Sequence, residues 1–310
     1  MIIKQVLKKN PFIFRTYQKY KFKKIRNICK EHKNMNVEEK QKVIEKEYFN
    51  RIHESINWKT PQKYTEIIQW RKLFYKDKRM TNYSDKILVR EYVKDTIGEQ
   101  YLIPILGEWQ SFSEIDFNSL PSSFVLKTNH GSGTNIIVKN KTELNYKTAK
   151  TLIDGWMSID YGYRYGLELH YSEIDRRIYA EKYIDLSNSS VEDYKFLCFD
   201  GKAHYCWVDV DRGESHRRNI YNLEWELQPW GQEKKNTDNQ IPKPQNFDLM
   251  VTLAEKLASE FSHVRVDFYN INGQIYFGEM TFTNGSGYDL IYPRKYDWEL
   301  GKLWKNYKNS

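Results

Sequence analysis

The sequence predicts an α+β fold in which helices come first and strands follow. Residues 38–80 place Ile, Phe, Tyr and Trp three and four positions apart, which is the spacing of one face of an α-helix. From residue 101 onward, the chain changes to short apolar segments that are typical of β-strands. With 310 residues, of which 40% are hydrophobic, it is long enough to bury a large core in two lobes.

Local signals place the individual elements. Thr60-Pro61 predicts the N-cap and first turn of a helix, and a second helix starts at Ser84 or Asp85 and stops at Gly98. Further helices are expected at 145–157 and 247–261, with a long loop or lid at 211–245. The strands are expected at 101–106, 123–128, 134–139, 176–184, 193–201 and 202–210, the last two joined by a hairpin turn at Asp200-Gly201, and a further hairpin follows in VRVDFYNINGQIYFGEM.

The positive charge is concentrated at the N-terminus. The formal net charge is +8, but residues 1–34 hold eleven Lys/Arg and one acid, a balance of +10 that leaves −2 for the remainder. Apolar residues alternate with the lysines here, as in segments that lie on an anionic membrane surface. A solvated basic tail is an equally good interpretation. Nucleic-acid binding is not expected, because no recognisable reading module follows the arm.

Cysteine usage and hydropathy predict a cytoplasmic location, with peripheral attachment at the inner face of the membrane if the arm binds lipid. The three cysteines, Cys29, Cys198 and Cys206, are an odd number without the spacing of a disulfide framework, so reduced thiols are expected. No stretch approaches eighteen consecutive apolar residues, and the basic N-terminus lacks the uninterrupted apolar core of a signal peptide.

The stretch FVLKTNHGSGTN, residues 124–135, predicts a phosphate-binding loop. An apolar strand places Lys127 at its end, and Gly131 and Gly133 let the backbone approach a ligand closely before TNIIV returns as a second strand. Loop N–H groups and an ammonium group can neutralise a polyphosphate from two sides. The stretch is not a Walker A loop, and taken alone the triplet GSG is more often a plain hairpin turn.

Two carboxylates, Asp267 and Glu279, lie on the two arms of the last hairpin and suit Mg²⁺ shared with substrate phosphates. A two-residue turn at Asn272-Gly273 places them on opposite faces of the ribbon, whereas a three-residue turn or a bulge places them on the same face, beside Arg265. The alternative is a solvated salt bridge between Arg265 and Glu279.

Read in order, the segments SDKILVREYV, FVLKTNHGSGTNIIV, IYAEKYI, DYKFLCFDGK, VRVDF and FGEMTFTNGSG resemble the ATP-grasp superfamily, and more narrowly the TupA-like ATP-grasp proteins of bacterial cell-surface polysaccharide loci. The resemblance spans roughly residues 45–305. It implies two α+β subdomains that hold ATP between their sheets. It also implies activation of a carboxylate to an acyl phosphate, followed by attack of an amine.

The resemblance also implies roles for particular residues. Phosphates would be contacted by Lys127 and Arg90. The loop that closes on them would be His130–Thr134, which includes Gly131, Ser132 and Gly133. Within this loop, His130 would cap phosphate or act as a base. The adenine edge would be read by the hinge strand Glu181, Lys182, Tyr183 and Ile184. Asp267 and Glu279 would bind Mg²⁺, Arg265 would steady the acyl phosphate, and further phosphate contacts would come from Lys195, Arg217 and Arg218.

Two departures from the superfamily pattern concern the metal and the substrate. The usual asparagine two residues after the metal glutamate is Thr281 here, so the third ligand is Thr281, Thr283 or Asn284. The N-terminal α/β domain with a glycine-rich turn is replaced by basic, aromatic helices over residues 1–84. The carboxylate and the amine therefore stay unassigned, as does the oligomeric state.

The expected organisation is a basic arm (1–45), a helical region (46–84), a small ATP-grasp subdomain (85–185) and a C-terminal subdomain with the metal site (186–310). The expected function is an ATP- and Mg²⁺-dependent carboxylate–amine ligase of cell-surface polysaccharide or glycopolymer biosynthesis. The alternative is a glycosyltransferase that uses a nucleotide sugar, suggested by the D-x-D motif Asp209-Val210-Asp211. This alternative leaves the Lys127 loop and the carboxylate hairpin unexplained.

Overall fold

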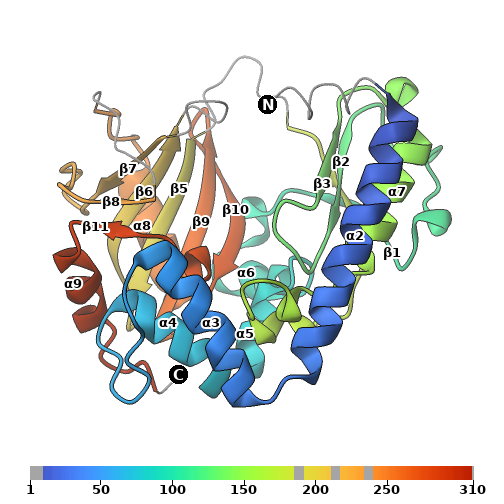
Figure 1. The fold of residues 1–310 in the computed structure, drawn as a ribbon. Helices are drawn as coiled ribbons and strands as arrows, with labels where there is room; N and C mark the ends of the chain where they lie inside the picture. Colours follow the sequence, from blue (N-terminus) through green and yellow to red (C-terminus); the bar gives the residue numbers. More distant parts are fainter. Residues whose placement is uncertain (1–9, 185–191, 211–216, 234–239, 309–310) are drawn as a thin grey trace. The chain divides into compact units, whose positions relative to one another are not determined.

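The computed structural model describes residues 10–184, 192–210, 217–233 and 240–308 (Figure 1). The chain forms two compact units built from alternating stretches of sequence. Unit 1 comprises Met1–Asn36, Asp85–Ile87 and Ile103–Asp185, and unit 2 comprises Val37–Ser84, Leu88–Leu102 and Leu186–Ser310.

Unit 1 is built on an antiparallel sheet with the strand order β1-β4-β2-β3. Its strands are β1 (Ile105–Trp109), β2 (Phe124–Thr128), β3 (Asn135–Val138) and β4 (Ile178–Lys182). Alternate residues of β2 are buried, and Phe124 and Leu126 pack with Ala149 and Ile153 of helix α7 (Tyr146–Met157). The remaining elements of unit 1 are short 3₁₀ turns at Phe112–Glu114, Lys141–Glu143, Tyr161–Tyr163 and Leu169–Glu173.

Helix α2 (Pro11–Asn34) packs along α7 (Figure 1). The Asn10 side chain caps its start by accepting hydrogen bonds from the backbone N–H groups of Phe12 (3.0 Å) and Ile13 (3.3 Å). Phe22, Ile25 and Cys29 are buried in a small core with Ile159. The interpretation of residues 1–34 as a solvated tail is therefore wrong for the helical part, because one face of α2 belongs to the core of unit 1.

Unit 2 contains an antiparallel sheet with the strand order β10-β9-β5-β6-β7. The strands are β5 (Glu192–Phe199), β6 (Lys202–Val210), β7 (Arg217–Tyr221), β9 (His263–Ile271) and β10 (Gln274–Thr281). A two-stranded ribbon joins β8 (Gly231–Gln232) to β11 (Ile291–Tyr292). The prediction of a long loop at 211–245 is wrong for β7 and β8. Residues 211–216 and 234–239 of that stretch lie outside the described residues.

The two faces of this sheet are covered differently. On one face, Phe196 and Val266 pack with Phe247 and Leu257 of helix α8 (Phe247–Ala258). On the other face, residues such as Trp207 pack with α4 (Tyr64–Phe74) and α9 (Lys295–Leu303). The other elements of unit 2 are α3 (Val37–Ile52), α5 (Lys78–Ser84), α6 (Val89–Thr96), and 3₁₀ turns at Glu99–Tyr101 and Asn284–Gly287.

Helix α4 starts later than Thr60-Pro61 predicts. Its first residue is Tyr64, and the Glu66 carboxylate accepts hydrogen bonds from the N–H groups of Gln62 (3.2 Å) and Lys63 (3.3 Å). The buried Asp297 carboxylate accepts from the N–H group of Thr65 at 2.9 Å, although it lies 232 residues further along the chain. None of the helices in the described ranges combines the length and apolar character needed to cross a membrane.

Candidate active site

In unit 1, Lys127 lies near the end of β2 and forms an ion pair with Glu181 of β4. The two strands are hydrogen-bonded neighbours, with Val125 opposite Glu181 and Lys127 opposite Tyr179, so the two side chains meet diagonally on one face of the sheet. The side chain of Lys127 is 23% exposed and that of Glu181 is 9% exposed. The lysine that the sequence assigned to phosphate and the acid that it assigned to adenine are thus in direct contact.

The loop after β2 is held by hydrogen bonds at its base and near its tip. The Thr128 hydroxyl donates to the Thr134 hydroxyl at 2.8 Å, which closes the loop across its base. The Lys86 ammonium donates to the carbonyl of Gly131 at 2.7 Å, and the Tyr161 hydroxyl donates to the carbonyl of Ser132 at 3.1 Å. A Cβ atom on Gly131 would lie 2.6 Å from the Tyr161 ring, so this position has no room for a side chain.

His130 is fully buried at the start of this loop. Its Nε2 lies 3.2 Å from the carbonyl oxygen of Trp156, so this nitrogen carries the proton and donates. Burial lowers the pKa of His130 to about 4, and the imidazole is therefore neutral at physiological pH. This geometry gives His130 a positioning contact between the loop and the end of α7, and lends no support to its expected role as a base.

In unit 2, a row of charged side chains crosses all five strands of the large sheet, and we refer to it as the polar row. Neighbouring strands place these residues side by side: Lys195 lies opposite Asp267, Asp193 opposite Asp209, Asp209 opposite Arg218, and Asp267 opposite Glu279. From edge to edge, the polar row consists of Glu279 (β10), Asp267 and Arg265 (β9), Lys195 and Asp193 (β5), Asp209 (β6) and Arg218 (β7).

Asp267 and Glu279 face the same side because β10 contains a bulge. The hairpin turn has two residues, Asn272 and Gly273, both with positive φ (51° and 84°). In a regular ladder, such a turn would turn Glu279 to the opposite face. The register shifts between Phe277 and Glu279, however, so that Phe277 pairs with Phe268 and Glu279 pairs with Asp267. Of the two arrangements that would place the carboxylates on the same face, a three-residue turn or a bulge, the structure has the bulge.

Arg265 ties the two carboxylates together. Its Nε and one terminal nitrogen donate to the two oxygens of Asp267, both at 2.7 Å, and the same terminal nitrogen donates to Glu279 at 3.0 Å. Burial alone would lower the pKa of Arg265, but the adjoining Asp267 carboxylate raises it above its usual value. The guanidinium is therefore permanently charged and rigidly held.

Lys195 is buried among three aspartates. It forms an ion pair with Asp193, and its ammonium lies 3.1 Å from Asp267 and 3.6 Å from Asp209. Burial opposes its charge, but Asp267 and Asp193 keep its pKa above the usual value. Burial likewise opposes the charge of Asp267, whose pKa is nevertheless lowered by Arg265 and Lys195. Lys195 and Asp267 are therefore both ionised at neutral pH.

The residues after β10 support Arg265 from the other side. The carbonyl oxygen of the Asn284 side chain accepts a hydrogen bond from Arg265 at 2.6 Å, and its amide group donates to Gln232 of β8 at 3.2 Å. The Thr281 hydroxyl donates to Glu279 at 3.2 Å, and Thr283 is buried. Of the three candidate third ligands, Thr281 forms a hydrogen bond with Glu279, and Asn284 holds Arg265.

The donor set fits a magnesium ion. Asp267 and Glu279 are register partners with hard oxygen ligands, and the Glu279 side chain is 36% exposed. The polar row holds four carboxylates against three cations, which leaves one negative charge. In the described ranges, no three Asp, Glu, His or Cys side chains converge as a group able to hold a metal ion. Further oxygen ligands would come from Thr281, from water or from a bound phosphate.

The other predicted residues lie apart from these contacts. Lys182 ends β4 with an exposed side chain, Tyr183 and Ile184 follow it half-buried, and Ser132 and Gly133 are exposed in the loop. Arg90 is half-buried on α6, a helix that buries Val89 and Val93 in the core on the α8 side of the sheet.

Two aspartates of the polar row were missed as site residues. Asp193 had no assigned role, and Asp209 was read only as part of a D-x-D motif. In the structure, Arg218 donates to both oxygens of Asp209, at 2.6 and 3.2 Å, and Asp211 lies outside the described residues. The available signal was the period-two spacing of Asp193 and Lys195 in the first half of an otherwise apolar strand, which places both side chains on the same face. Arg217, at the start of β7, is exposed.

Several solved structures are similar to this chain. D-alanine–D-alanine ligase from Bacillus anthracis, complexed with ATP, has 16% identity and a TM-score of 0.38, covering 65% of this chain and 55% of its own. The enzyme from Helicobacter pylori has 15% identity and a TM-score of 0.43, covering 78% and 66%. N5-carboxyaminoimidazole synthase from Aspergillus clavatus has 12% identity and a TM-score of 0.36, covering 68% and 45%.

The chain thus spans between about half and two thirds of the length of these proteins. No curated protein matches it. The family model described as TupA-like ATPgrasp matches residues 66–305, which is most of the chain and includes the Lys127 loop and the whole polar row. The chain belongs to the TupA-like ATP-grasp family.

Proposed function

We propose that the protein is an ATP- and Mg²⁺-dependent ligase that activates a carboxylate as an acyl phosphate and joins it to an amine. Cell-surface polysaccharide or glycopolymer biosynthesis is the proposed setting. The observation that carries the proposal is the register-paired Asp267 and Glu279, bridged by a buried Arg265 with Lys195 alongside, in a chain of the ATP-grasp family.

The charges of the polar row suit phosphoryl transfer. A carboxylate that attacks a phosphate meets like-charge repulsion, so catalysis depends on fixed positive charge and positioning. Arg265 and Lys195 are buried, ionised and held by several hydrogen bonds, so they would bind phosphate oxygens without being reorganised. Mg²⁺, when bound by Asp267 and Glu279, would neutralise further phosphate charge.

A purely structural role explains the polar row less well. A buried ion-pair network carries a large desolvation cost, and hydrophobic residues of similar volume are often equally stable. Buried charged groups of this kind are instead typical of functional sites. In unit 1, the partial exposure of Lys127 leaves its ammonium group open to a phosphate ligand, and Glu181 holds it until one binds.

The glycosyltransferase alternative rests on the D-x-D motif, in which Asp209 pairs with Arg218 and Asp211 lies outside the described residues. A thermal-shift panel tests the proposal against it directly. Mg-ATP is expected to raise the melting temperature, since a ligand that binds only the folded state stabilises it by mass action. A shift with a UDP-sugar and Mg²⁺, and none with ATP, would reverse the assignment.

A further inference from the structure

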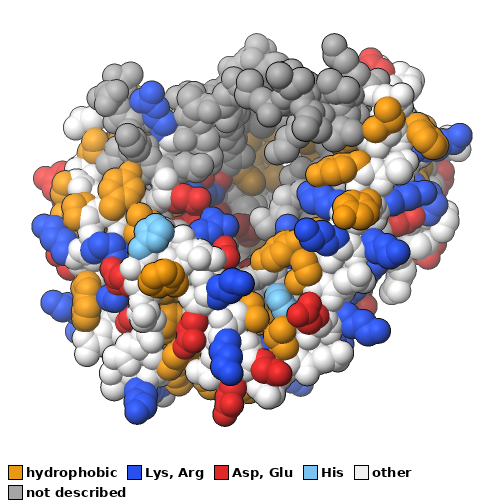
Figure 2. All heavy atoms as spheres, viewed as in Figure 1, with side chains coloured by type: hydrophobic (Ala, Val, Ile, Leu, Met, Phe, Trp, Pro, Cys, Tyr) orange, Lys and Arg blue, Asp and Glu red, His pale blue; other side chains and the backbone are white. Residues whose placement is uncertain are grey.

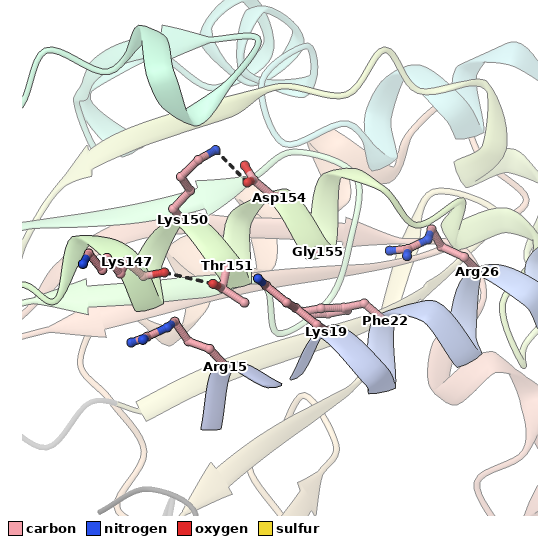
Figure 3. A pocket seen from close by; sticks show the side chains of 9 residues that line it. All are labelled: Arg15, Lys19, Phe22, Arg26, Lys147, Lys150, Thr151, Asp154 and Gly155. Atoms are coloured by element: carbon pink, nitrogen blue, oxygen red, sulfur yellow. Dashed lines mark hydrogen bonds and ion pairs between the residues drawn. The ribbon is translucent and has the colours of Figure 1, made fainter. Parts of the chain in front are cut away.

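A basic groove lies between α2 and α7 in unit 1 (Figure 3). Its volume is about 420 Å³, and it is lined by Arg15, Lys19, Phe22, Arg26, Lys147, Lys150, Thr151, Asp154 and Gly155. Five of these nine residues are Lys or Arg. Asp154 is the one acid in the lining, and it forms an ion pair with Lys150 at 2.7 Å. The groove therefore concentrates positive charge.

Helix periodicity explains how the cations come together. Arg15, Lys19, Phe22 and Arg26 follow one another at intervals of four, three and four residues, so they form one stripe along α2. Phe22 fills the space above Gly155 of α7, where an added Cβ atom would lie 2.1 Å from its ring. This contact fixes α2 so that the basic residues of its stripe line the groove together with Lys147 and Lys150 of α7 (Figure 3).

The outward face of the same helix exposes large apolar side chains. Phe12 is 70% exposed, Tyr20 68%, Ile13 47% and Tyr17 46%. Lys19 lies within this stretch and the exposed Lys21, Lys23 and Lys24 follow it, and Glu31 is the one acid of the helix. Figure 2 shows hydrophobic and basic side chains mixed along this part of the surface. Isolated exposed apolar residues are common, but four within nine residues of one helix are not explained by the packing of α2 on α7.

We propose that α2 and the basic groove dock the protein on an anionic membrane surface. Aromatic rings and Ile13 would enter the headgroup region, which is where amphipathic rings are most stable. Lipid phosphates would bind the cations of the groove, because Lys and Arg near an anionic leaflet are attracted to it. The proposal concerns a surface of unit 1, whereas the polar row belongs to unit 2, and it does not depend on the ligase assignment.

A membrane fits these observations better than a nucleic acid. Both would use phosphates and aromatic residues, but a nucleic acid would leave the aliphatic Ile13 without a function. Beyond α2 the lining of the groove includes Lys147 and Lys150, but the chain after residue 34 has a net charge of −2 overall, so it offers no excess of positive charge to the rest of an extended phosphate backbone.

Co-sedimentation of the full-length protein with vesicles tests the proposal. One set of vesicles contains phosphatidylcholine alone, and the other contains equal parts of phosphatidylcholine and phosphatidylglycerol. The groove variant is Lys19→Ala/Arg26→Ala/Lys147→Ala, and the surface variant is Phe12→Gln/Tyr20→Gln. The matched control is Lys42→Ala/Lys46→Ala, which removes two exposed lysines from α3. Circular dichroism checks that each variant keeps its helices.

The wild type is expected to bind the anionic vesicles and not the neutral ones. The groove variant should bind about fivefold more weakly for each cation removed, on the order of a hundredfold in total. The surface variant should also lose binding, and the control should match the wild type. Equal binding by the wild type and the groove variant would overturn the proposal.

Two soluble competitors separate the possible sources of phosphate. If inorganic phosphate releases the protein from vesicles and the surface variant binds them normally, the groove is a site for a soluble anion and the membrane assignment fails. If a single-stranded DNA oligonucleotide binds the wild type more tightly than the vesicles do, the surface is a nucleic-acid site. Release by neither competitor, together with weaker binding of both variants, is the expected result.

Discussion

Glu279 lies directly opposite Asp267 although the turn that joins their strands has only two residues, because Gly278 is bulged out of the ladder. The two carboxylates differ in their surroundings, since Asp267 is buried and Glu279 is partly exposed. Substitution of Asp267 is therefore expected to affect both stability and turnover, whereas substitution of Glu279 is expected to affect mainly turnover.

We expect Glu279→Gln to abolish Mg²⁺-dependent ATP turnover while changing the free energy of unfolding by less than about 1 kcal/mol, because the ion pair it removes is partly exposed. Asp267→Asn should also abolish turnover but cost roughly 3 kcal/mol, since it leaves Arg265 and Lys195 buried with less compensation. Turnover assays and denaturant titrations measure the two effects. Full activity in Glu279→Gln would exclude the proposed metal site.

Lys127→Ala should weaken ATP binding by roughly 1.5–3 kcal/mol, because it removes a charge-assisted contact to phosphate. Lys139→Ala, which removes an exposed lysine just after β3, is the matched control and should bind ATP normally. Isothermal titration calorimetry compares the two. Equal ATP affinities would show that the loop does not bind the nucleotide.

Because His130 is buried in its neutral form, we expect the stability of unit 1 to decrease as the pH falls. Its pKa is about 4 in the folded protein and 6.5 in an ordinary site, so the unfolded state takes up a proton first as the pH falls. The stability from this neutral histidine is complete above pH 6.5 and is lost as the pH falls towards 4. His130→Gln keeps a donor for the Trp156 carbonyl and does not titrate. Its free energy of unfolding should fall less than that of the wild type between pH 7 and pH 5, by about 2 kcal/mol.

For Asp289 in unit 2 we expect the opposite: its contribution to stability decreases as the pH rises. Burial and the neighbouring Glu233 carboxylate raise its pKa from 3.8 to about 7, so its contribution to stability is complete below pH 3.8 and lost as the pH rises through 7. Asp289→Asn should therefore be more stable than the wild type at pH 8, by about 1–2 kcal/mol after allowance for partial exposure. Thermal melts at pH 5 and pH 8 measure this, and a gain of the same size at both pH values would contradict the assignment.

Gly155→Val should loosen α2 from α7, because the new side chain would overlap the Phe22 ring. Overpacking of this kind costs about 1–3 kcal/mol. Hydrogen–deuterium exchange is expected to show faster exchange in residues 22–32 than in the wild type. Gly133→Ala is the control, because it strains a loop of the same unit at a positive φ of 69° while its Cβ atom meets no neighbour within 4 Å. Unchanged protection of α2 in Gly155→Val would show that this contact does not hold the helix.

Local signals in the sequence predicted most of the strands and helices correctly. Asp200-Gly201 and Asn272-Gly273 form the expected turns because both residues of each pair adopt positive φ. Strands β7 and β8 were missed, since RRNIY and GQ are too short and polar to give a periodic pattern. The start of α4 was misplaced because Asp297, which fixes its first turn, is far away in the sequence.

The candidate site was predictable only where its residues are close in the sequence. Arg265, Asp267 and Glu279 lie on one hairpin, so their proximity follows from strand pairing, although the bulge that aligns them could not be chosen over a longer turn. Asp193 and Asp209 join them through the strand order β10-β9-β5-β6-β7, which no local pattern specifies. The burial of His130 could not be recognised from its loop sequence.

During synthesis of the chain, α2 cannot pack until α7 and the residues after it have also been made. Cys29 donates a hydrogen bond to the carbonyl of Asp160, 131 residues later in the chain, and Phe22 is buried only once Gly155 is in place. At about 5–20 residues per second, the ribosome needs on the order of ten seconds to supply these partners. During that interval the inward face of a basic, aromatic helix lacks its packing partners. The nascent chain therefore offers chaperones and lipids a larger apolar surface than the finished protein does.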